Sequence, residues 1–297
     1  MHDWLWPMFA TGLALMLSGI LHVVVGLALQ DDWHGPLSFR KPALFGLSTG
    51  LTCVSISWIW GQIKTTWFDP AIVWLTAFAL LFEVTLITLQ TWRGVPSHFN
   101  HESYKDAFIE VAMLVLITAA SVGILWLTIR CLLPNVFLNA DDAMRLAIRA
   151  GLVLLIVSLG LGFLISAIGW EELRAGRSPH IYPPGGVLKF PHGACLHAVQ
   201  TLPLMAGLWR WLGSRYALAR VAHLTAAHVA FLIFACWQTF HGLPREELHA
   251  LGIVWIAAAG LLALFSLLPD SAFDATIPNW GSRHNADDRN AMAADDQ

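Results

Sequence analysis

Long runs of apolar residues, separated by short polar segments, dominate the chain. A hydrocarbon core ~30 Å thick needs about 20 residues of helix at ~1.5 Å per residue. Because the runs are continuous rather than alternating, they favour helices over a β-barrel. The sequence therefore predicts an all-α, polytopic transmembrane helical bundle of about eight spanning helices. The expected spans are residues 8–29, 43–63, 71–90, 108–131, 147–169, 193–212, 219–241 and 248–268.

Composition supports a membrane location for the 297-residue chain. Hydrophobic residues make up 57% and charged residues 12%, against about 25% charged residues in soluble proteins. This balance excludes a cytosolic enzyme and leaves the lipid bilayer as the expected partner. A net charge of −3 gives no basic surface for nucleic acid. Residues 1–270 are predicted to form a single transmembrane helical domain, and residues 271–297 a polar, disordered C-terminal tail.

Eight spans place both termini on one face, named side A, and the opposite face is side B. Lysine and arginine number nine on side A and eight on side B, so the positive-inside rule does not decide the orientation. Two side A connections carry arginines that resemble plain topology signals. We therefore expect a multi-pass protein of a bacterial inner membrane with both termini in the cytoplasm. These arginines are Arg130, Arg145, Arg149, Arg210, Arg215 and Arg220.

Polar and ionisable residues inside the predicted spans concentrate in the side B half. Such groups are costly in a membrane and usually face the bundle interior. For any one of them, a hydrogen bond between helices is the simpler explanation. The asymmetry of the whole set favours a polar cavity open to side B. The group comprises His22, Glu83, Gln90, Glu110, His197, Gln200, Gln238 and His241.

Three side B connections have unusual sequences: Arg-Lys-Pro at 40–42, Gln-Thr-Trp-Arg-Gly-Val-Pro-Ser-His-Phe-Asn-His at 90–101, and a segment at 185–203. The second contains two histidines three residues apart. On a short helix they would lie on one face and could bind one metal ion together. In the third, H-x-x-x-x-H is followed by glutamine. The predicted metal ligands are His98, His101, His192 and His197. Lys41 and Arg93 could bind an anionic group.

The strings Arg-Lys-Pro at 40–42, Gln-x-x-Arg-Gly-x-x-Ser-His-Phe-Asn at 90–100 and His-x-x-x-x-His-x-x-Gln-x-x-Pro at 192–203 resemble a family of uncharacterised bacterial multi-span membrane proteins. The resemblance covers residues 35–245 through scattered motifs. It indicates positions of interest and implies no reaction.

Imidazole suits haem iron, Fe, Cu and Zn, so one hypothesis is a haem- or metal-dependent membrane oxidoreductase or electron-transfer unit. Haem b would need two axial histidines, for which the candidates are His22, His197 and His241, with a quinone or a small anionic ligand as partner. A di-iron desaturase is disfavoured because the chain has no His-His pair. The candidates for catalytic roles are Lys41, Glu83, Gln90, Arg93, Glu110 and Gln200. The sequence does not decide whether the protein is an enzyme.

The alternative hypothesis is a transporter or proton-pathway protein that uses Glu83, Glu110 and His22. Transporters often contain broken helices. Glycine and proline here lie mostly at predicted helix ends, so continuous helices are expected. An assembly, sensor or lipid-modifying role is a third class that no sequence feature excludes.

Overall fold

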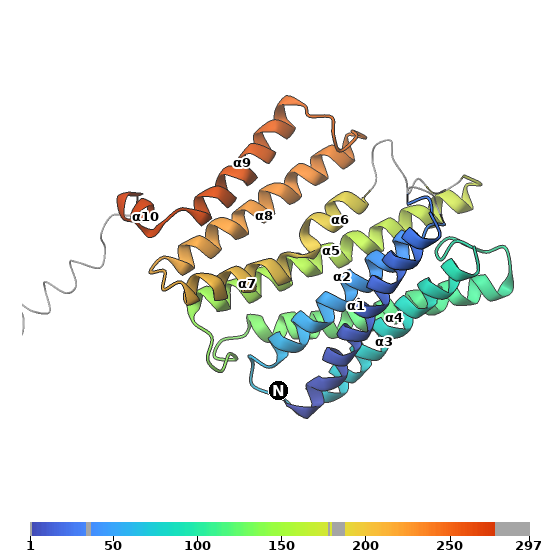
Figure 1. Cartoon of the computed structure of the whole chain (residues 1–297), viewed down its shortest axis with the longest axis horizontal. Helices are drawn as coiled ribbons and strands as arrows, with labels where there is room; N and C mark the ends of the chain where they lie inside the picture. Colours follow the sequence, from blue (N-terminus) through green and yellow to red (C-terminus); the bar gives the residue numbers. More distant parts are fainter. Residues whose placement is uncertain (1, 34–36, 178, 180–187, 277–297) are drawn as a thin grey trace, which may run out of the picture.

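The computed structural model describes residues 2–33, 37–177, 179 and 188–276, and the regular secondary structure of this part is helical apart from one isolated β-bridge. Seven of the described helices are long and apolar enough to cross a membrane. The all-α transmembrane bundle is thereby confirmed (Figure 1). The elements are a 3-10 helix η1 (Asp3–Leu5), α1 (Trp6–Ala28), α2 (Arg40–Trp60), α3 (Asp69–Trp92), α4 (Tyr104–Leu132), α5 (Asp142–Arg174), α6 (Lys189–Leu196), α7 (Ala198–Trp211), α8 (Ala217–Phe240), α9 (Ala250–Leu267) and α10 (Asp270–Thr276).

The predicted span at 193–212 is the one that differs from a continuous helix. Two helices, α6 and α7, form it, and they meet at His197. Both pack along α5 in the opposite direction (Figure 1). Ser158 contacts His192 of α6, and Gly151, nearer the start of α5, lies against Val199 of α7. Counting this broken crossing with the seven long helices gives the eight crossings that the hydrophobic pattern predicts.

The break at His197 has a local cause in the sequence. Pro203 lies inside α7 and has no N–H to donate to the carbonyl of Val199, within one turn of the break. The carbonyl of His197 instead accepts from the N–H groups of both Gln200 and Thr201. The expectation of continuous helices was wrong here, because this proline lies inside a span rather than at its end.

Glycines allow α1 and α2 to approach closely. A Cβ on Gly46 would lie 2.7 Å from the carbonyl oxygen of Leu15 and 2.8 Å from the Cα of Gly19. A Cβ on Gly19 would lie 2.7 Å from the backbone nitrogen of Leu47. Such small-residue contacts are the usual way in which helices pack in a membrane, where lipid gives no hydrophobic drive. They fix α2, which carries polar side chains toward the other helices.

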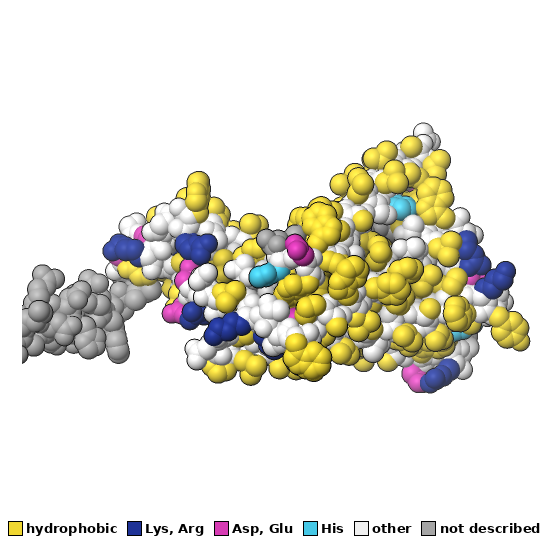
Figure 2. All heavy atoms as spheres, turned by 90° about the horizontal axis from the view of Figure 1, so that it is seen from below, with side chains coloured by type: hydrophobic (Ala, Val, Ile, Leu, Met, Phe, Trp, Pro, Cys, Tyr) yellow, Lys and Arg dark blue, Asp and Glu magenta, His cyan; other side chains and the backbone are white. Residues whose placement is uncertain are grey.

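Charged and apolar residues are segregated along the molecule. Figure 2 shows lysine and arginine side chains toward its two ends and hydrophobic side chains over most of the surface between them. At side A, α10 packs back on the turn between α7 and α8, where Asp270 accepts from Ser214 at 2.7 Å. The first residues of the predicted tail thus belong to α10, and residues 277–297 lie outside the described part of the chain.

Candidate functional site

A lysine and a histidine meet at the side B end of the bundle. Lys41 is the second residue of α2, and its Nζ lies 3.2 Å from Nδ1 of His98 in the α3–α4 connection. Burial lowers the pKa of His98 well below its ordinary value, and the nearby cations Lys41 and Lys189 lower this pKa further. His98 is therefore a neutral imidazole whose Nδ1 accepts a hydrogen bond from the Lys41 ammonium.

Glu83 is a carboxylate buried within α3. It lies nine residues before the helix ends at Trp92, which is about 14 Å at 1.5 Å per residue. Only 6% of the residue is exposed, and it makes no hydrogen bond or ion pair with any described residue. It does interact electrostatically with Lys41. We name Lys41, Glu83 and His98 the Lys41 cluster. It joins a deep carboxylate to a histidine on the side B connection.

Glu110 of α4 holds the connection that carries His98. Its Oε1 accepts from the N–H of Phe99 at 2.8 Å, and its Oε2 accepts from the N–H of Asn100 at 3.0 Å. Nε2 of His101 lies 3.1 Å from the same Oε2. These contacts satisfy the carboxylate and explain its burial. Glu110 therefore has a positioning role for the connection and, unlike Glu83, is fully engaged.

Phe99 has an unusual backbone conformation in this connection. Its φ is 61°, in the left-handed region that residues with a Cβ rarely adopt. The Glu110 bond to its N–H and the packing of its ring on Gly169 of α5 support this conformation. A Cβ at Gly169 would lie 2.3 Å from the tip of the Phe99 ring. His101 also packs on Trp170, with ring centroids 4.5 Å apart. The α3–α4 connection therefore packs against the last turns of α5.

Arg93 and Gln90 belong to a separate ion-paired group. Nη1 of Arg93 lies 2.7 Å from Oδ1 of Asp106 and also donates to Oε1 of Gln90. Gln90 donates to the same Asp106 oxygen at 3.1 Å. Ser103 caps α4 by accepting from the N–H of Asp106. Arg93 therefore closes the α3–α4 connection, and the geometry does not place it beside Lys41 as an anion ligand.

A second polar network crosses the bundle at the break between α6 and α7. Nε2 of His197 lies 3.4 Å from the hydroxyl of Ser48 on α2, and its Nδ1 lies 3.3 Å from Oε1 of Gln200. Gln200 donates to Thr52 of α2 at 3.2 Å. Nearby, Nδ1 of His192 lies 2.8 Å from the carbonyl oxygen of Ser158. These contacts tie the broken crossing to α2 and α5.

The predicted metal and haem ligands do not converge. Among the described residues, no group of three or more His, Cys, Asp or Glu side chains could hold a metal ion. His98 and His101 bind different partners. His22 uses Nδ1 on the carbonyl of Ser18 at 2.7 Å, and its Nε2 accepts from Trp92 at 2.9 Å. His241 is exposed at the end of α8 and stacks on its own helix at Trp237. The described side chains therefore do not support the metal and haem assignments.

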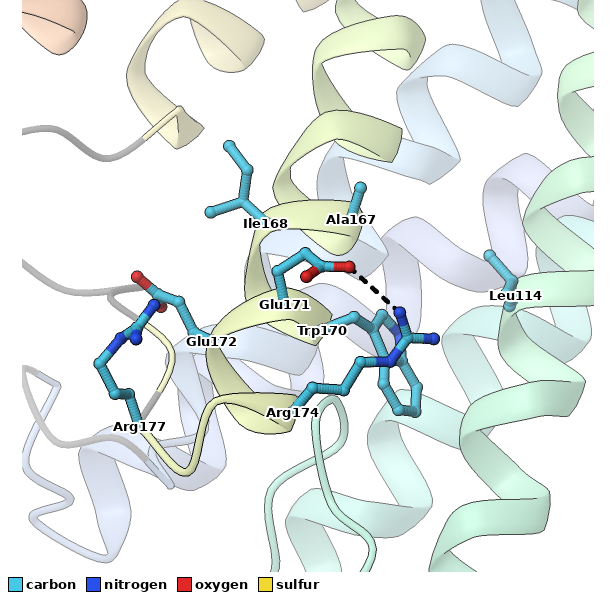
Figure 3. A pocket seen from close by; sticks show the side chains of 8 residues that line it. All are labelled: Leu114, Ala167, Ile168, Trp170, Glu171, Glu172, Arg174 and Arg177. Atoms are coloured by element: carbon cyan, nitrogen blue, oxygen red, sulfur yellow. Dashed lines mark hydrogen bonds and ion pairs between the residues drawn. The ribbon is translucent and has the colours of Figure 1, made fainter.

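A surface hollow of about 650 Å³ lies apart from these networks, at the outer end of α5. Apolar residues of α4 and α5 form part of its wall, and charged residues of the α5 end form its rim (Figure 3). Arg174 is already paired with Glu171 at 3.1 Å there. The hollow thus offers no convergent polar group for chemistry.

Comparison of the chain with protein-family models, curated proteins and solved structures finds no match. The resemblance to a family of uncharacterised bacterial multi-span membrane proteins stays a prediction. The site must be interpreted from its own contacts.

Sequence reasoning missed several residues that the structure places in these networks. Ser48 and Thr52 were not considered, although Gly46 and Gly50 form a G-x-x-x-G pattern that predicts a helix interface around them. Asp106 follows Ser103 by three residues, which is a helix-capping signal. Both signals were present in the sequence.

Proposed function

We propose that the protein is a proton-pathway or proton-coupled transport protein in which Glu83 exchanges a proton with side B through Lys41 and His98. The observation that supports this function is Glu83 itself. It is a buried carboxylate without a hydrogen bond in the described part of the chain, and it interacts with Lys41. Ionisable side chains inside membrane spans often mark ion pathways and proton relays.

The proton route follows from the chemistry of the three side chains. When the two side chains come within hydrogen-bond distance, the Lys41 ammonium gives a proton to Glu83, which leaves a neutral amine and a carboxylic acid. A proton from side B then converts neutral His98 to an imidazolium, which passes a proton from Nδ1 to the Lys41 amine 3.2 Å away and becomes neutral again. Charge is conserved at each transfer, and no redox partner is needed. His22 and Glu110, which the sequence also suggested for such a route, have structural contacts instead.

The haem or metal oxidoreductase is the less favoured alternative. It needs imidazole nitrogens that face one another at matched depth. His22 has both nitrogens engaged by Ser18 and Trp92, and His197 faces Ser48 and Gln200. Our proposal also keeps the expected orientation, with side A in the cytoplasm of a bacterial inner membrane.

The test is proton flux in liposomes that contain the purified protein and a trapped pH-sensitive dye. Under an imposed pH gradient, we expect Glu83→Gln to lower the protein-dependent flux at least tenfold. The control is Glu171→Gln, which removes an exposed carboxylate at the end of α5 and should retain the wild-type rate. Equal flux in wild type and Glu83→Gln would overturn the proposal, as would wild-type flux no greater than that of empty liposomes.

A further inference from the structure

The direction of each hydrogen bond in the side-chain ring around His197 follows from one backbone group. The carbonyl of Ser48 can only accept, so the hydroxyl of Thr52 donates to it at 2.9 Å. The Thr52 oxygen then accepts from the amide nitrogen of Gln200 at 3.2 Å. The carbonyl oxygen of Gln200 therefore faces His197. Nδ1 of His197 carries the hydrogen that is donated to this oxygen across 3.3 Å.

These directions leave a lone pair on Nε2 of His197. A neutral imidazole has one N–H, which here is on Nδ1. Nε2 lies 3.4 Å from the hydroxyl of Ser48, a group that can either donate or accept. The hydroxyl donates to the neutral ring. When Nε2 carries a proton, the hydroxyl rotates and accepts from it, while the bond from Nδ1 to Gln200 is unchanged. His197 can therefore bind and release a proton without losing a contact.

His22 has partners of the opposite kind. Its Nδ1 donates to the carbonyl of Ser18 at 2.7 Å, and its Nε2 accepts from the indole N–H of Trp92 at 2.9 Å. An indole nitrogen only donates. A second proton on His22 would set two N–H groups against each other and break the bond to Trp92. His22 is therefore held neutral, and it provides a comparison for His197 within the same molecule.

The ionisable groups near His197 are also imidazoles. His192 of α6 interacts electrostatically with His197. His228 of α8 is joined to it through Thr201, whose hydroxyl lies 3.2 Å from the His197 carbonyl oxygen and 2.9 Å from Nε2 of His228. Residues 151–167 of α5 contain no ionisable side chain, and α2 presents its two hydroxyls. The printed contacts thus surround the ring with hydroxyl, amide and imidazole groups.

His197 is also placed deeper in the bundle than Lys41. Its partner Ser48 follows Lys41 by seven residues on α2, which is two turns on one face of the helix and about 10 Å of depth. The third sequence motif, residues 192–203, contains His197 and contributes no residue to the Lys41 cluster. This motif therefore has a possible role further along the pathway.

We propose that His197 is a second proton-binding residue of the pathway, which takes a proton at Nε2 while the Ser48 hydroxyl changes from donor to acceptor. The inference rests on the proposed proton pathway and places its next proton-binding residue at the break between α6 and α7. Water in the pathway supplies the proton and takes it back. The proton joins the lone pair of Nε2 and leaves from the same atom, so charge is conserved and no redox partner is needed.

The first test is NMR spectroscopy of the full chain, with histidine labelled with nitrogen-15, in nanodiscs between pH 7.5 and 5. Backbone correlations assign the side-chain signals, so wild type is sufficient for this test. We expect Nε2 of His197 to change from a lone-pair nitrogen to a protonated one as pH falls, and Nε2 of His22 to remain an acceptor. A His197 ring whose Nε2 stays unprotonated over this range would overturn the proposal.

A pair of serine variants tests the contact that receives the proton. Ser48→Ala removes the acceptor of the protonated ring, so proton binding to His197 should weaken about threefold to tenfold, which is the contribution of one ordinary hydrogen bond. The control is Ser55→Ala on the same helix, because the Ser55 hydroxyl bonds to the carbonyl of Leu51 at 2.9 Å. This control should leave the His197 signal unchanged. Equal behaviour of the two variants would overturn the proposed role of Ser48.

The second test is the proton flux assay in liposomes. His197→Gln keeps a polar side chain and cannot carry a proton, so we expect the flux to fall by about threefold or more. The control His249→Gln changes an exposed histidine and should retain the wild-type rate. Full flux in His197→Gln together with lost flux in Glu83→Gln would overturn this inference alone. Full flux in Glu83→Gln would overturn the proposed function, and the NMR experiment would still decide whether His197 binds a proton.

Discussion

Two groups of buried charge at opposite ends of the bundle differ in how they are paired. At side A, Asp69 is 0% exposed and its carboxylate accepts from Arg130 at 2.9 and 3.0 Å. Trp126 and the N–H of Thr66 donate to the same carboxylate. Each buried charge there has an opposite charge and additional hydrogen bonds, which is the condition under which an ion pair is tolerated in an apolar medium.

At side B, the charges of the Lys41 cluster lack such partners, although Arg93 and Asp106 form an ion pair at 2.7 Å at the same end. Glu83 makes no hydrogen bond with a described residue, and Lys41 meets a neutral imidazole at 3.2 Å. Arg40 has no ion pair in the described part of the chain. The comparison teaches that side A uses charge to hold helices together. In the Lys41 cluster, Glu83 has no hydrogen-bonded partner among the described residues, which is the condition that our proposed proton pathway needs.

The largest expected effect is the loss of the side A pair. Asp69→Ala leaves the Arg130 guanidinium buried without its carboxylate, so we expect the free energy of unfolding to fall by about 3–5 kcal/mol. The measurement is denaturant unfolding in detergent, followed by tryptophan fluorescence. The control Asp142→Ala, an exposed residue in an i,i+3 pair, should change it by less than about 1 kcal/mol. Equal effects of the two variants would show that burial does not distinguish these pairs.

The next largest effect concerns Glu110, the side B carboxylate whose oxygens accept hydrogen bonds. Glu110→Gln replaces an ionised acceptor of two backbone N–H groups and His101. Hydrogen bonds to charged groups contribute about 1.5–3 kcal/mol, so we expect a loss of stability in that range. Hydrogen exchange should also become faster at the amides of Phe99 and Asn100. Unchanged exchange at these two amides would contradict the positioning role of Glu110.

The sequence was sufficient for most of the fold, because membrane spans follow from long apolar runs that any bundle must have. The eight predicted spans correspond to seven long helices and the broken crossing of α6 and α7. The break depends on one proline inside a span. The direction in which the chain continues after the break also depends on how α6 and α7 pack against α2 and α5. A pattern within one helix does not specify this tertiary packing.

The sequence predicted less of the candidate site, because it gives depth along a helix and not direction around the bundle. Lys41 and His98 come from separate sequence motifs, and the structure brings them 3.2 Å apart. Arg93 and His22 seemed equally suited to chemistry, but Asp106 and Trp92 engage them. Such pairing depends on which helix is the neighbour, and no single-helix pattern specifies that.

A smaller effect should appear as pH dependence. His98 has a pKa well below its ordinary value of ~6.5. The unfolded chain therefore binds more protons than the folded one below that pH, and stability falls as pH falls from 7.5 to 5. At side A, Ser214, Arg220 and the N–H of Arg215 lower the pKa of Asp270 to about 2. Its stabilisation is fully present above ~4 and is lost only below that pH.

The measurement for this prediction is the melting temperature as a function of pH. Between pH 7.5 and 5, His98→Gln should flatten the curve, whereas Asp270→Asn should lower the whole curve without changing its slope. The slope that His98 contributes is at most about 1.4 kcal/mol per pH unit. A wild-type curve that rises as pH falls would give the opposite sign and would contradict a neutral His98.

The smallest expected effect on stability is that of Glu83→Gln. This variant gives the most direct comparison between the unpaired carboxylate at side B and the ion-paired Asp69 at side A. Glutamine keeps the size of glutamate and removes a buried charge that makes no hydrogen bond with a described residue. Because nothing is left unpaired except Lys41, which retains His98, we expect the free energy of unfolding to stay within about 0.5 kcal/mol of wild type or to rise. If Glu83 instead formed a structural pair with Lys41, the single variant would lose stability as Asp69→Ala does, and Glu83→Gln with Lys41→Gln would recover part of the loss. Denaturant unfolding of these variants distinguishes the two cases without reference to transport. A Glu83→Gln protein that is stable but no longer conducts protons would show that this carboxylate has a functional role and not a structural one.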